Sequence, residues 1–138
     1  MRSTLQQARV CANASGAVKA PIDILGLSNG ARSGLTGFIA GLARQKRLAG
    51  ANVTINNLLP GMHHTAAAEE RLGGIAAEQG KSYEEAVEDW IREWRIPAEK
   101  FGNIDDFGTI CALFCSQQAS YIIGQNLVID GGATTATF

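Results

Sequence analysis

The sequence predicts an α/β fold built on a parallel, doubly wound sheet, of which this chain supplies about three strands with flanking helices. Short apolar stretches alternate along the chain with longer segments of helical periodicity. That alternation is typical of parallel sheets covered by helices on both faces. Three strands are few for such a sheet, whose faces and edges need cover. We therefore predict one partial domain over residues 1–138, the second half of a larger unit.

The composition indicates a soluble protein with a hydrophobic core. Of the 138 residues, 46% are hydrophobic and 18% are charged, which is unlike a disordered chain. A net charge of −1 removes the electrostatic argument for nucleic acid or an anionic membrane as the main partner. No apolar run reaches the roughly 18 residues of a membrane helix. The polar start at residues 1–7 also lacks the apolar stretch of a signal peptide.

The cysteines indicate a reducing compartment, so we expect a cytoplasmic protein. There are three of them, an odd number without metal-ligand spacing or a CxxC pair. Cys111 and Cys115 are four residues apart in a predicted helix and would stack on one face as small hydrophobic side chains. We predict a structural role for these two and for Cys11, and no metal site.

The first half of the chain predicts a strand, a loop and a long helix. Residues 1–8 resemble the end of a helix, and 9–14 a buried strand. A loop rich in small residues, 15–28, precedes a helix over 29–47. Its predicted buried face shows helical spacing and consists of Ala31, Leu35, Phe38, Ile39 and Leu42.

A second stripe on the 29–47 helix consists of glycines. Gly30, Gly34, Gly37 and Gly41 are spaced by 4, 3 and 4 residues. Each glycine costs a helix up to about 1 kcal/mol relative to alanine. We therefore expect another backbone to pack closely against this face, and predict a homo-oligomer through the 29–47 region.

The second half of the chain begins with a predicted strand over 52–59, which Pro60-Gly61 ends. A segment over 62–80 is predicted to be mobile, with helical character in 66–77. The capping box Ser82-Tyr83-Glu84-Glu85 opens the next helix. Its apolar face consists of Tyr83, Val87, Trp90, Ile91 and Trp94.

The last two predicted elements are a helix and a strand. Asn103, with Asp106 three residues later, caps a helix that carries Phe107, Ile110 and Phe114 on its apolar face. The final strand is predicted over 126–130, before Gly131-Gly132.

A set of short motifs occurs in a characteristic order. They are Asn56-Asn57-Leu58-Leu59-Pro60-Gly61 followed by Thr65, then Gly102–Phe107, Phe114–Ser116, Tyr121–Asn126 and Val128–Gly132. No single motif is specific, but the ordered set from about Arg9 onward resembles the C-terminal half of a short-chain dehydrogenase/reductase. The resemblance implies a Rossmann-like fold and an oxidoreductase that uses NAD or NADP. Its substrate would be a small molecule with a carbonyl or alcohol group.

The catalytic positions depart from the usual pattern of that family, which has a Ser, then a Tyr, and a Lys four residues after the Tyr. Aligned on the helix segment 37–44, the resemblance places Ser15 at the Ser, Ser28 at the Tyr and Arg32 at the Lys. An aliphatic hydroxyl is a far weaker acid than a phenol, and Arg32 stays charged throughout. The usual proton donor therefore has no direct counterpart.

Other residues inherit roles from the same resemblance. Ser15 would hydrogen-bond the substrate oxygen, although a loop serine can equally cap the next turn. Pro60, Gly61 and Thr65 follow a strand end, where open α/β sheets bind ligands, and would contact the nicotinamide carboxamide. The Tyr83–Trp94 helix resembles the mobile substrate lid of the family, or is ordinary core.

Three residues flank the same cleft and are candidates to replace the proton donor: Lys19, His63 and His64. For each of them, a solvated loop residue is the more common interpretation.

Three functional hypotheses follow. The first is the C-terminal half of an NAD(P)-dependent oxidoreductase, inactive as residues 1–138 alone. The second is a non-catalytic subunit or degenerate remnant that keeps the assembly surface, favoured by Ser28, Arg32 and the lack of a GxGxxG phosphate turn in the sequence. The third is a small binding domain that dimerises through the glycine-striped helix.

Overall fold

The computed structural model describes residues 8–136, so the predicted helix end at 1–8 lies outside the described residues apart from Ala8. Its sheet has three parallel strands in the order β1-β2-β3. Strand β1 is Arg9–Asn13, β2 is Thr54–Pro60 and β3 is Asn126–Ile129. The predicted α/β fold with three parallel strands is confirmed.

Strand β2 is the centre of the fold. Its residues from Thr54 to Leu59 are all buried, as expected of a strand with a neighbour on each side and helices on both faces. Arg9 of β1 is in register with Thr54, and Asn57 of β2 is in register with Asn126 of β3.

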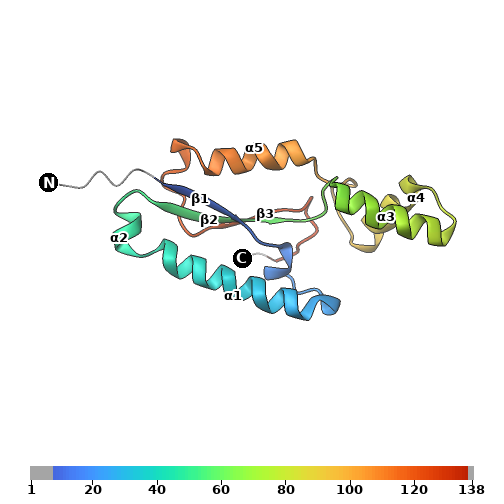
Figure 1. Cartoon of the computed structure of the whole chain (residues 1–138), viewed down its shortest axis with the longest axis horizontal. Coiled ribbons are helices and arrows are strands. Elements are labelled where there is room, and N and C mark those ends of the chain that lie inside the picture. Colours follow the sequence, from blue (N-terminus) through green and yellow to red (C-terminus); the bar gives the residue numbers. More distant parts are fainter. Residues whose placement is uncertain (1–7, 137–138) are drawn as a thin grey trace.

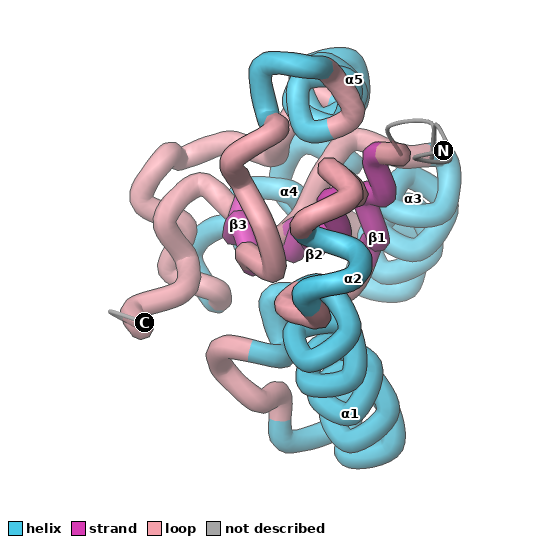
Figure 2. The backbone as a smooth tube through the Cα atoms, turned by 90° about the vertical axis from the view of Figure 1, so that its left-hand side faces the viewer, coloured by secondary structure: helices cyan, strands magenta, loops and turns pink. Residues whose placement is uncertain are grey.

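Helices cover the two faces of the sheet. Helix α1 (Gly26–Ala43) and the short α2 (Lys46–Ala49) lie on one side, and α5 (Ile104–Phe114) lies on the other (Figures 1 and 2). The long helix begins three residues earlier than predicted and stops at Ala43, because Gln45 has extended backbone angles. Single turns of 3-10 helix occur at Gly16–Val18, Asp23–Leu25 and Gln117–Ala119.

The buried face of α1 differs from the predicted one. Thr36, Ile39 and Ala43 are buried, and Ile39 and Ala43 pack on Ile55 of β2. Phe38, predicted to be buried, is 66% exposed, and Leu35 is 44% exposed. The predicted helical spacing is correct. The side chains buried against the sheet, however, form a neighbouring stripe that includes the polar Thr36.

The glycine stripe of α1 faces away from the rest of the described chain. A Cβ atom placed on Gly30, Gly34, Gly37 or Gly41 would meet nothing within 4 Å. The expected close backbone neighbour is therefore not part of this chain within residues 8–136. The predicted contact would therefore have to come from the backbone of a second copy of the chain.

Helices α3 (Ala66–Gln79) and α4 (Tyr83–Glu93) form a hairpin beyond the carboxyl ends of the strands (Figure 1). The predicted capping box is confirmed: Ser82 Oγ accepts from the Glu85 N–H at 3.1 Å, and Glu85 Oε2 accepts from the Ser82 N–H at 2.8 Å. The aromatic face of α4 packs into a core cluster around Leu72 of α3, Ile96 and Phe101.

The cysteines come together where β1 meets α5. Cys11 and Cys111 are half-buried, and the thiols of Cys11 and Cys115 both interact with that of Cys111. Cys115 is exposed at the end of the helix, which the prediction of small buried hydrophobic side chains did not anticipate. None of the three forms a disulfide. Among the described helices, none is both long and apolar enough to cross a membrane.

Candidate functional site

The carboxyl ends of the three strands meet at one edge of the sheet, where open α/β folds bind ligands. Strand β1 leads to Ser15, β2 to Gly61 and β3 to Asp130. Two cavities lie at this edge, and the segment Pro60–Met62 lines both of them. The topology therefore brings together the predicted residues Ser15, Pro60 and Gly61.

The larger cavity has a volume of about 310 Å³. Its polar lining includes Ser15, Arg71, Asp130 and Thr134. Its other walls are mostly apolar and come from the 3-10 region before α1, from the hairpin, and from the segments after β2 and β3. They include Ala17, Ala20, Ile22, Ile24, Leu25, Met62, Trp90, Trp94, Ile96 and Ala133. An apolar cavity with a few polar groups is the usual form of a small-molecule site.

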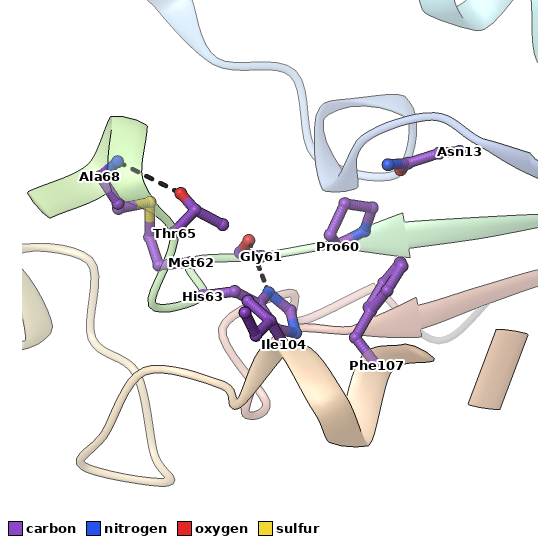
Figure 3. Close-up of a pocket in the computed structure, with 9 residues that line it drawn as sticks. All are labelled: Asn13, Pro60, Gly61, Met62, His63, Thr65, Ala68, Ile104 and Phe107. Carbon is purple, nitrogen blue, oxygen red and sulfur yellow. Dashed lines mark hydrogen bonds between the residues drawn. The ribbon is translucent and has the colours of Figure 1, made fainter. Parts of the chain in front are cut away.

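The smaller cavity, of about 260 Å³, lies on the other side of the same segment. Figure 3 shows Pro60, Gly61, His63 and Thr65 along the chain that leaves β2, with Phe107 of α5 opposite. Thr65 is the N-cap of α3, and its Oγ accepts from the Ala68 N–H at 3.2 Å. Its hydroxyl proton remains free to donate to a ligand.

Glycine at position 61 allows the turn after β2 to approach the end of β3. A Cβ atom at Gly61 would lie 2.5 Å from Asp130 Cβ, much closer than contact distance. The Gly61 N–H donates to the Ile129 carbonyl at 2.9 Å. Asp130 in turn accepts from the N–H groups of Gly132 at 2.9 Å and Thr134 at 2.7 Å. These bonds fix the segment that lines both cavities.

Ser15 lies just after the carboxyl end of β1, has an extended backbone, and caps a turn of 3-10 helix. Its Oγ accepts from the Ala17 N–H at 3.2 Å. Ser15 therefore does cap the next turn, as one of the two interpretations expected. Its hydroxyl proton is not used by the cap. Because Ser15 also lines the larger cavity, capping and ligand binding are compatible.

Ser28 and Arg32 lie on successive turns of α1 and contact each other. Arg32 Nε donates to Ser28 Oγ at 3.2 Å, and Arg32 Nη1 donates to the Ala14 carbonyl at 2.9 Å. Arg32 thus ties α1 to the end of β1, one residue before Ser15. Neither Ser28 nor Arg32 lines either cavity within the described chain.

The three alternative proton donors do not gather at Ser15. His63 is buried rather than solvated: its Nδ1 lies 3.1 Å from the Gly61 carbonyl, and its ring packs edge-on against Phe107 at 5.2 Å. His64 is exposed beside Phe101. Lys19 ends the 3-10 turn that follows Ser15 and lines neither cavity.

Two buried asparagines of β2 were not predicted to have a role. Asn56 donates to the Ile122 carbonyl at 2.8 Å and accepts from the Gln125 N–H at 2.9 Å. Asn57 donates to Asn126 Oδ1 at 2.7 Å. Asn56 holds the loop before β3 against β2, and Asn57 holds the first residue of β3. Buried amides gain stability from such partners. The sequence could have indicated this role, since two amides inside a buried strand need such hydrogen bonds.

Arg71 is a third residue whose role was not predicted from the sequence. It lies on α3 and lines the larger cavity, with its guanidinium carbon 4.9 Å from the centre of the Trp90 ring. Trp90 stacks in turn on Trp94, with ring centres 5.7 Å apart. Arginine in a charged helix carries no distinctive sequence signal, so only the packing of α3 on α4 reveals this arrangement.

Comparison with known proteins matches a family model described as enoyl-(acyl carrier protein) reductase to residues 5–134. The 3-oxoacyl-[acyl-carrier-protein] reductase FabG of Aquifex aeolicus is 31% identical over 73% of this chain and 35% of its own length. Dehydrogenase/reductase SDR family member 4 of Oryctolagus cuniculus is 32% identical over 82% of this chain and 38% of its own. The chain thus spans well under half the length of these relatives.

Solved structures show the same fold. L-sorbose reductase from Gluconobacter frateurii, in complex with NADPH and L-sorbose, superposes with a TM-score of 0.85 at 20% identity. The match covers 94% of this chain and 48% of that one. A short-chain oxidoreductase from Pseudomonas aeruginosa PAO1, described as containing an atypical catalytic centre, gives a TM-score of 0.76 at 17% identity and covers 92% and 46%.

Proposed function

The chain belongs to the short-chain dehydrogenase/reductase family, and from this we propose that it is the C-terminal half of an NAD(P)-dependent oxidoreductase that interconverts a carbonyl and an alcohol. The observation that carries the proposal is the pair of cavities that share the segment Pro60–Met62. One cavity would take the nicotinamide end of the cofactor, and the other the substrate. Bound nicotinamide supplies or accepts the hydride.

The smaller cavity fits the nicotinamide end. Thr65 has a free hydroxyl proton to donate to a carboxamide oxygen, and Pro60 and Gly61 supply a rigid wall. The sequence contains no GxGxxG turn for the phosphates. We therefore propose that residues 1–138 hold only one end of NAD or NADP and are inactive alone.

Ser15 is the best-placed residue on the substrate side. Its Oγ accepts a bond from the backbone, which restricts the side chain and leaves the hydroxyl proton available for another acceptor. A carbonyl oxygen in the larger cavity can accept that proton in a hydrogen bond. Such a bond strengthens as negative charge develops on the oxygen, which is how a fixed donor promotes hydride addition.

Ser28 and Arg32 complete the proposed catalytic set. Arg32 holds the end of β1 through the Ala14 carbonyl and thereby positions Ser15. The Ser28 hydroxyl accepts from Arg32 Nε and keeps its own proton available.

The alternative is a non-catalytic subunit that keeps the fold and an assembly surface. It is favoured by one specific observation: Ser28 and Arg32 face each other rather than either cavity. This alternative does not require the smaller cavity to bind nicotinamide, which makes the two hypotheses separable by cofactor binding.

We also propose a homo-oligomer through α1. Leu27 is 95% exposed and Phe38 is 66% exposed, beside a glycine stripe without a neighbour. Exposed apolar side chains next to a flat backbone surface favour contact with a second copy. The free thiols support a reducing, cytoplasmic location.

The test compares the two halves of the cofactor by thermal unfolding. Reduced nicotinamide mononucleotide at about ten times its dissociation constant should stabilise the chain by about 1.4 kcal/mol, whereas AMP should have no effect. Thr65→Ala should abolish the shift, and Ser120→Ala, on an exposed loop remote from both cavities, should preserve it. Equal stabilisation by the two mononucleotides, or stabilisation by neither of them, contradicts the proposed oxidoreductase.

A further inference from the structure

One side of the larger cavity is a three-layer stack of Arg71, Trp90 and Trp94. The guanidinium carbon of Arg71 lies 4.9 Å from the centre of the Trp90 ring. The Trp90 and Trp94 rings are 5.7 Å apart with an angle of 18° between their planes. All three residues line the cavity. The stack restricts the long arginine side chain, so a ligand that binds its N–H groups loses less side-chain entropy.

The charge on Arg71 is not compensated within the described residues. The ion pairs of residues 8–136 are Lys81–Asp89 and Arg92–Asp89, both away from the cavity. The carboxylate in the cavity lining belongs to Asp130, and both its oxygens accept backbone N–H groups. Arg71 therefore has charged N–H donors without a carboxylate, whereas the negative charge of Asp130 is already hydrogen-bonded.

The rest of the cavity offers apolar surface that a ligand would cover. Ile24 is 80% exposed and Leu25 is 42% exposed, although both line the cavity. Ile96 and Met62 add further apolar wall. Covering such surface is favourable in proportion to the apolar area removed from water. The cavity thus combines an apolar body with one cationic side.

We propose that the substrate of this cavity is an amphipathic anion, an apolar molecule that carries a carboxylate, and that Arg71 determines this specificity. The proposal rests on the proposed function, because it takes the larger cavity as the substrate side. A planar guanidinium donates two parallel hydrogen bonds to a carboxylate, a geometry that neutral ligands do not match. Arg71 binds the charged end while Ser15, which follows β1 and lines the same cavity, is free for the reacting oxygen.

The experiment uses the intrinsic fluorescence of the full 138-residue chain. Its two tryptophans are Trp90 and Trp94, both in the cavity lining, so the signal reports on this site. The chain is titrated with octanoate, octan-1-ol and octyltrimethylammonium, which share an apolar body and differ in charge. We expect octanoate to bind roughly fivefold more tightly than octan-1-ol, the size of an exposed ion pair.

The variants separate Arg71 from general surface charge. Arg71→Gln should remove the preference for octanoate over octan-1-ol. Arg92→Gln is the matched control, since Arg92 lies on α4 with its guanidinium paired to Asp89 outside the cavity, and it should keep the preference. If Arg71→Gln does not fold, the unmodified chain is titrated in about 1 M salt instead. The Debye length there is about 3 Å, so the preference for octanoate should disappear.

Three results would overturn the proposal: equal binding of octanoate and octan-1-ol, tighter binding of octyltrimethylammonium, or no change in fluorescence with any probe. A preference that survives in Arg71→Gln overturns the assignment to Arg71. These outcomes are independent of the proposed oxidoreductase, because the titration contains no cofactor. The chain can therefore bind reduced nicotinamide mononucleotide without preferring octanoate, or prefer octanoate without binding the mononucleotide.

Discussion

Replacing Gly61 by alanine perturbs the turn that both cavities share. The alanine Cβ would lie 2.5 Å from Asp130 Cβ and 2.7 Å from Asp130 Cα. Both of these atoms are fixed by the backbone, so no change of side-chain rotamer relieves the contact. Strands β2 and β3 must move apart at this point, where the Gly61 N–H donates to the Ile129 carbonyl at 2.9 Å.

The expected cost combines two effects. Overpacking a well-filled site costs about 1–3 kcal/mol, and weakening the hydrogen bond between Gly61 and Ile129 costs about 1 kcal/mol. The free energy of unfolding should therefore fall by about 2–4 kcal/mol. For a domain of this size each kcal/mol shifts the melting temperature by about 3 °C, so it should fall by about 6–12 °C.

Urea unfolding followed by far-UV circular dichroism measures this change. Gly108→Ala is the matched control, because Gly108 lies within α5 and its Cβ would meet nothing within 4 Å. There the same substitution should raise stability by up to about 1 kcal/mol through helix propensity. Unfolding of Gly61→Ala and of the unmodified chain at the same urea concentration would show that the contact with Asp130 carries no cost.

Two further predictions concern the surface of α1 and the thiols. Gly37→Leu should stay folded, since a Cβ at this position would meet nothing within 4 Å in residues 8–136 outside its own helix. It should convert the proposed oligomer to a monomer by native mass; an unchanged mass contradicts the proposed interface. Burial, followed by the interaction with the neighbouring Cys111 thiol, raises the pKa of Cys11 from 9.0 to about 12. The folded thiol thus keeps a proton that the unfolded thiol releases, so stability should fall as pH rises from about 9 to about 12. Urea midpoints of Cys11→Ala should decline less over that range, and parallel curves would be the contrary result.

Local sequence determined the elements whose signals are local. Ser82 and Glu85 form their capping box because both partners lie within one helical turn. Residues 52–59 predicted a strand, and Leu58 and Leu59 are buried in β2. Strand β2 ends at Pro60, one residue later than predicted, and Gly61 follows it at the same edge of the sheet as Ser15.

Only the tertiary structure decided which neighbours these elements meet. Helical spacing shows that α1 has stripes, but the sheet selects the one with Thr36 and Ile39 and leaves Phe38 exposed. His63 becomes buried because Gly102 and Phe107, distant in the sequence, close over it. Arg71 gains its place in the cavity from the packing of α3 on α4. Such contacts join residues far apart in the chain, and no local pattern encodes them.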